Sequence, residues 1–90
     1  MGKNELLCLL KDVLAGLRLV EIERAENVLH SIINNYELVI CKLVSDDLTE
    51  NLIKNSPREY LEIYSDYENP LLQKMDHAQK ELNMFIVANP

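Results

Sequence analysis

Apolar residues recur every three or four positions over most of the chain, the spacing that places them on one face of an α-helix. A first series covers residues 6–20, a second covers residues 22–43, and the two are out of phase where they meet. The first comprises Leu6, Leu10, Val13, Leu17 and Val20, and the second comprises Ile22, Ala25, Leu29, Ile32, Tyr36, Val39 and Leu43. No cluster of turn residues separates them, so the pattern slightly favours one long or kinked helix from about Asn4 to about Val44 over two helices.

Polar residues interrupt this pattern after residue 44. Ser45, Asp46 and Asp47 are residue types that cap helices, because their side-chain oxygens accept from exposed backbone N–H groups. We therefore expect a short helix over about Asp47–Lys54, which would bury Leu48 and Leu52.

Two further helix starts are encoded downstream. Ser56, Pro57 and Glu59 form a capping-box pattern, with Ser56 as the N-cap and Pro57 as the first helical residue. Asn69-Pro70 has the same cap-and-proline order, but the apolar phase continues across it, so a single helix kinked at Pro70 is also compatible. The last stripe comprises Leu71, Met75, Ala78, Leu82 and Phe85.

These elements predict an all-α fold in a single domain over residues 1–90. Three to four helices would form an antiparallel bundle or a long helical hairpin. Leu9, Leu19, Ile33 and Ile40 lie outside the main series, so the N-terminal arm is apolar on more than one face. Because a two-helix hairpin cannot cover that much apolar surface, either a third and fourth helix of this chain or another subunit must cover it. We favour oligomerisation, as a homodimer or a hetero-complex, to complete the fold.

Charge narrows the classes of partner. The chain has 9 basic and 15 acidic residues, for a net charge of −6, and no two basic residues are adjacent. This disfavours nucleic acid and anionic membranes, which attract clustered positive charge, and it favours a basic protein partner. No apolar run approaches the roughly 20 residues that span a bilayer. Cys8 and Cys41 are expected to be reduced and buried, which suits a cytoplasmic protein.

The sequence contains no recognisable catalytic or cofactor-binding motif. His30 and His77 belong to neither of the His/Glu patterns that bind metal on helices, and there is no glycine-rich phosphate loop. We therefore expect no catalytic residue, cofactor or metal, and a function other than an enzyme.

The segment Glu59–Glu68 is the strongest candidate for a partner-binding site. It contains three of the four tyrosines and four carboxylates, which are Glu59, Tyr60, Glu62, Tyr64, Asp66, Tyr67 and Glu68. Tyrosines supply rigid contact area at interfaces, and acidic residues around them would orient a basic partner. The alternative is that the tyrosines fill the core while the acids face solvent.

Together these features predict a non-enzymatic, acidic interaction module that sequesters or neutralises a partner protein, of the chaperone, inhibitor or immunity type. The competing hypothesis is a structural homodimer whose apolar stripes serve self-assembly alone.

Overall fold

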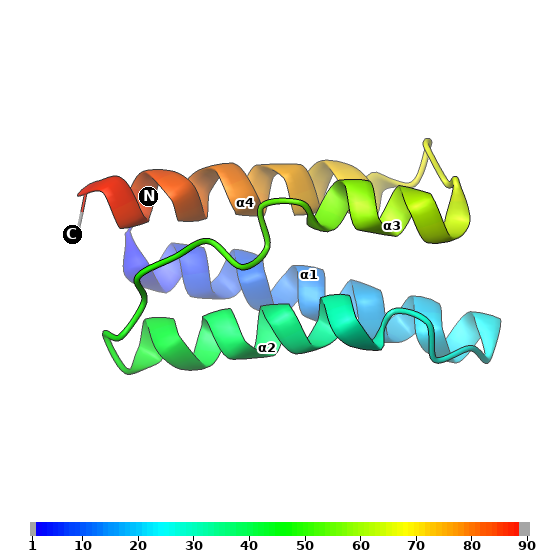
Figure 1. Cartoon of the computed structure of the whole chain (residues 1–90), viewed down its shortest axis with the longest axis horizontal. Coiled ribbons are helices and arrows are strands. Elements are labelled where there is room, and N and C mark those ends of the chain that lie inside the picture. Colours follow the sequence, from blue (N-terminus) through cyan, green and yellow to red (C-terminus); the bar gives the residue numbers. More distant parts are fainter. Residues whose placement is uncertain (1, 89–90) are drawn as a thin grey trace.

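Four helices alternate in direction along one axis in a computed structural model of the protein, which describes residues 2–88 (Figure 1). They are α1 (Lys3–Arg24), α2 (His30–Val44), α3 (Ser56–Tyr64) and α4 (Pro70–Ala88), and no strand occurs among the described residues. Helix α1 packs against α2 and α4, and α3 packs against α4 and α2. The predicted all-α class is confirmed, and the helices pack as an antiparallel bundle measuring 37 × 21 × 18 Å.

The N-terminal arm is two helices, so the interpretation as one long helix is wrong. Helix α1 ends because Ala25 adopts a left-handed conformation with φ 53°, and the backbone N–H of Glu26 donates to the carbonyl of Glu21 at 3.3 Å. The out-of-phase step in the apolar pattern lies just before this turn. As a result, Ile22 is exposed and the core stripe of the second series begins only at Leu29.

The short helix expected over residues 47–54 is absent, and residues 45–55 instead form turns, a bend and irregular backbone. The carboxylate of Asp46 pairs with the ammonium of Lys3 at 2.7 Å instead of capping a helix. Asn51 accepts from the backbone N–H of Ile53 at 3.1 Å and donates to the carbonyl of Gln79 at 2.9 Å. An eight-residue helix is marginal by itself, and these local side-chain bonds offer the backbone an alternative.

Helix α3 begins where predicted, but the predicted capping box does not form. The structure places Asn55 at the N-cap position without a side-chain capping bond, and Pro57 lies in the first turn. Ser56 is buried, and its hydroxyl lies 2.7 Å from the hydroxyl of Tyr36. Its side chain is therefore used for packing between α3 and α2.

Helix α4 is separate from α3, which excludes a single kinked helix. Ser65, with φ 46°, ends α3, and α4 starts at Pro70 as the sequence predicts. The side-chain oxygen of Asn69 accepts from the backbone N–H of Leu71 at 2.9 Å, which caps the first turn.

The core is one continuous apolar cluster between the helices. Its members from the predicted stripes are Leu6, Leu10, Val13, Leu17, Leu29, Ile32, Tyr36, Val39, Leu43, Leu71, Met75, Ala78 and Leu82. Gly16 allows a close approach between α1 and α4, because a Cβ at that position would lie 2.8 Å from Leu71 Cδ1. No helix among the described residues is long and apolar enough to cross a membrane.

Candidate protein-interaction site

Tyr60, the first tyrosine of the candidate segment, is buried in the core. Its hydroxyl donates to Asp66 Oδ2 at 3.3 Å and accepts from the side-chain amide of Asn69 at 3.3 Å. The same Asn69 amide donates to Asp66 Oδ2 at 2.9 Å. Burial raises the pKa of Tyr60, and the negative charge of Asp66 raises it further. Tyr60 thus belongs to the core, one of the two interpretations that the sequence left open.

Tyr64 joins the end of α3 to the end of α1. Its ring lies edge-on to that of Tyr60, with centroids 5.6 Å apart, and the guanidinium carbon of Arg24 lies 4.0 Å from the Tyr64 ring centroid. The Tyr64 hydroxyl donates to Glu26 Oε2 at 3.1 Å, and Arg24 pairs with Asp66 at 3.4 Å. Desolvation and the bond to Glu26 raise the pKa of Tyr64. These contacts connect the α1–α2 turn to the α3–α4 turn.

The other predicted site residues do not gather around these two tyrosines. Tyr67 is 73% exposed, because α3 ends at Tyr64 and the helical spacing that would align the three rings stops there. Glu62 and Glu68 are exposed and Glu59 is half-buried. Glu62 pairs along α3 with Arg58 at 3.5 Å. The three tyrosines predicted as anchors therefore differ in environment. Tyr60 lies in the core, Tyr64 makes intramolecular contacts and Tyr67 is exposed.

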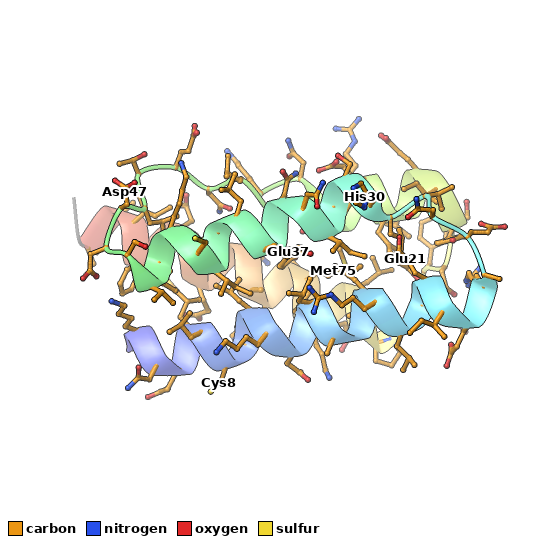
Figure 2. The ribbon with its side chains drawn as sticks, turned by 90° about the horizontal axis from the view of Figure 1, so that it is seen from below. Cys8, Glu21, His30, Glu37, Asp47 and Met75 are labelled. Atoms are coloured by element: carbon orange, nitrogen blue, oxygen red, sulfur yellow. The ribbon has the colours of Figure 1, made fainter. Side chains whose placement is uncertain are left out.

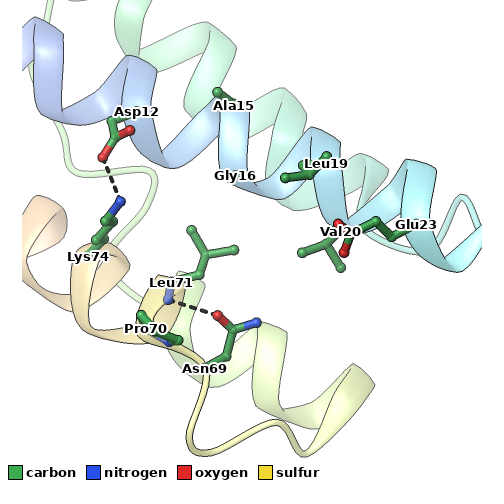
Figure 3. Close-up of a pocket in the computed structure, with 10 residues that line it drawn as sticks. All are labelled: Asp12, Ala15, Gly16, Leu19, Val20, Glu23, Asn69, Pro70, Leu71 and Lys74. Atoms are coloured by element: carbon green, nitrogen blue, oxygen red, sulfur yellow. Dashed lines mark hydrogen bonds and ion pairs between the residues drawn. The ribbon is translucent and has the colours of Figure 1, made fainter.

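A groove between α1 and the start of α4 is a second candidate that the sequence analysis did not identify. It encloses about 460 Å³. Its lining residues are Asp12, Ala15, Gly16, Leu19, Val20, Glu23, Asn69, Pro70, Leu71 and Lys74 (Figure 3). Figure 3 shows Leu71 pointing from α4 towards α1, while Lys74 reaches across to Asp12 at 3.0 Å.

Exposed apolar side chains on α1 extend this groove. Leu19 is 54% exposed and Ile22 is 76% exposed, and together with Ala15 they recur at the spacing of one helix face. We call Ala15, Leu19 and Ile22 the outer face of α1. The spacing of these three residues was visible in the sequence. In the sequence pattern Ile22 belongs to the predicted core series and Leu19 to none, so apolar spacing alone does not indicate this face.

The groups that suggest catalysis or metal binding are dispersed. Among residues 2–88 no group of three or more His, Cys, Asp or Glu side chains is placed to hold a metal ion. His30 and His77 are exposed, and His77 Nδ1 lies 4.0 Å from a carboxylate oxygen of Glu81. Cys8 and Cys41 are free and exposed, so their expected burial is wrong; Figure 2 shows Cys8 on α1. Each occupies a position of its helix that points away from the core.

The sequence matches no family model, and comparison with curated proteins and with solved structures finds no match to either.

Proposed function

We propose that this chain is a non-enzymatic interaction module that binds a partner protein and sequesters or neutralises it, in the manner of a chaperone, inhibitor or immunity protein. The observation that supports this most directly is the groove between α1 and α4 with the exposed Leu19 and Ile22 beside it. Exposed apolar side chains beside a groove are a common mark of a protein-binding site. Covering the groove with a partner would remove these side chains from water.

The acidic surface supports a basic partner. A net charge of −6 attracts positively charged proteins and accelerates their association, and it opposes binding to nucleic acid. The exposed Tyr67, with its acidic neighbour Glu68, is a second contact area on the α3–α4 turn. Tyr60 and Tyr64 would contribute indirectly, by holding this turn against the end of α1.

A structural homodimer is the alternative, because the outer face of α1 could also pack against its own copy. Sedimentation of the purified chain separates the two. A monomer that captures a defined protein supports the interaction module, whereas a stable dimer without any partner supports self-assembly alone.

The proposal is tested by affinity capture from an extract of the host organism, with three forms of the purified chain as bait. We expect the wild type to capture a specific protein and Leu19→Asp/Ile22→Asp to lose it. Val44→Asp is the matched control, because Val44 is a 58% exposed apolar residue at the end of α2, outside the groove. Failure of the wild type to retain any protein above background would overturn the proposed function.

A further inference from the structure

We infer that the α1–α4 groove receives an amphipathic helix of the partner, which places apolar side chains against Leu19 and Val20 and a lysine or arginine beside Glu23. This deepens the proposed function and rests on it. The occupant is defined by its chemistry, which is an apolar helix face with a basic group near one end.

The shape of the groove fits a helix. Its lining on α1 extends from Asp12 to Glu23, which are about 16 Å apart at about 1.5 Å per residue. That length corresponds to about three turns of a helix lying along α1, which is the scale of known helix-in-groove recognition. Ala15, near the middle of this lining, carries only a methyl group, whereas the Gly16 position is already covered by the Leu71 side chain. A partner helix can therefore approach α1 closely at Ala15.

The lining of the groove carries more negative than positive charge. Lys74 is the single basic residue of the lining, and its ammonium is neutralised by Asp12 at 3.0 Å. Glu23 lines the other end of the α1 segment (Figure 3). Within residues 2–88 it forms no ion pair. One carboxylate is thus in excess. A basic side chain on the occupant would neutralise it in a site from which the bound helix excludes part of the water.

A second copy of this chain fits the groove less well. It would add a second net charge of −6, and the only groove lysine it could offer is already paired with its own Asp12. A copy that presented its outer face of α1 would also bring another Glu23 towards the first. Like charges within an interface oppose association, whereas a basic helix relieves the same carboxylate.

The test uses a synthetic amphipathic peptide of about fifteen residues, the length at which an isolated helix becomes viable. The peptide has leucines at i, i+4 and i+7 and a lysine at one end of that face, and a second peptide carries glutamate in place of the lysine. Binding to the full chain is measured by fluorescence titration and located by backbone amide NMR shifts. We expect shifts over residues 12–23 and 69–74, with the lysine peptide binding about tenfold more tightly than the glutamate peptide.

Charge reversal makes the test specific to the groove. Glu23→Lys should invert the preference, so that the glutamate peptide binds more tightly. Glu50→Lys makes the same change in net charge at an exposed position outside the groove and should leave the preference unchanged. Circular dichroism confirms that both variants remain folded.

Three results would overturn the inference: no binding of the lysine peptide to the wild type, shifts on another face, or equal responses to the two charge reversals. A wild-type dimer that Leu19→Asp dissociates would assign the groove to self-association and overturn it as well. A different result would show that the proposed function is wrong: no host protein is captured, whether or not the peptides bind. If capture survives Leu19→Asp/Ile22→Asp, the chain is still an interaction module but the groove is excluded.

Discussion

The hydroxyl groups of Tyr36 and Ser56 lie 2.7 Å apart in the core, where both side chains are almost completely excluded from solvent. Tyr36 belongs to α2 and Ser56 to the first turn of α3, so this bond joins two helices that are separated in sequence by the 45–55 segment. Each hydroxyl is the other's partner, and removing either one leaves a buried polar atom unsatisfied.

Tyr36→Phe and Ser56→Ala should therefore each lower the free energy of unfolding by about 1–2 kcal/mol. The double variant should lose clearly less than the sum, because the second change removes an atom that the first has already left unpaired. Urea denaturation of the four proteins provides this cycle. Additive losses would indicate that Ser56 acts independently of Tyr36, as a helix cap would.

Alkaline pH should destabilise the protein through the same tyrosine. Burial raises the pKa of Tyr36 far above its ordinary value of 10.0, so the native state keeps a proton that the unfolded state releases. The contribution of Tyr36 to the free energy of unfolding is fully present below pH 10. It is lost as the pH rises above that value, by at most about 1.4 kcal/mol per pH unit for this group. Urea unfolding of wild type and Tyr36→Phe between pH 8 and about pH 11 isolates the effect. Parallel stability curves for the two proteins would contradict it.

Apolar spacing correctly predicted the helix faces that pack into the core. Leu6, Leu10 and Leu17 all lie in the core, as do Met75 and Leu82 of the last stripe. Spacing failed at the turns, since a break at Ala25 needs neither glycine nor proline when backbone bonds to Glu21 and Ile22 satisfy the last turn. A periodic pattern records which face is apolar and carries little information about where the chain reverses.

The candidate site was only partly accessible to sequence reasoning. The tyrosine cluster was found, but Tyr60 and Tyr67 could not be separated into core and surface without knowing that α3 ends at Tyr64. The α1–α4 groove is not predictable from sequence spacing, because its two walls are far apart in the chain. The role of Leu71 opposite Gly16 depends on the packing of α1 against α4, which no local pattern specifies.

Asn69 should be among the most sensitive polar positions. It caps α4 through the N–H of Leu71 and donates to both Tyr60 and Asp66. Asn69→Ala removes all three bonds and should cost about 2 kcal/mol in the free energy of unfolding. Asn69→Ser retains a capping oxygen but not the amide, so about half of the loss should remain. Equal losses for both variants in urea denaturation would show that capping contributes nothing.

Arg24 should stabilise the fold more than an ordinary surface arginine, because its guanidinium both stacks on Tyr64 and pairs with Asp66. Arg24→Ala should cost about 1 kcal/mol and accelerate amide exchange in the turns 25–29 and 65–69. Arg18→Ala is the control: Arg18 pairs with Glu37 at 3.1 Å between two exposed side chains, and its loss should cost less than about 0.5 kcal/mol. Indistinguishable unfolding curves for the two variants would remove the distinction between the sites.

Glu21 should be a position where a substitution increases stability. Figure 2 shows it on the side of α1 that faces α2, and its Oε2 atom is buried without a hydrogen-bond partner among the described residues. Burying an unpaired carboxylate oxygen costs free energy, and methionine has a similar length without that oxygen. Glu21→Met should therefore raise the free energy of unfolding by about 1 kcal/mol. Glu23→Met removes the same charge from an exposed position two residues further along α1 and should change stability by less than about 0.5 kcal/mol. If thermal and urea unfolding showed instead that Glu21→Met destabilises the protein, the carboxylate would have to interact favourably with the start of α2, whose positive dipole end attracts negative charge.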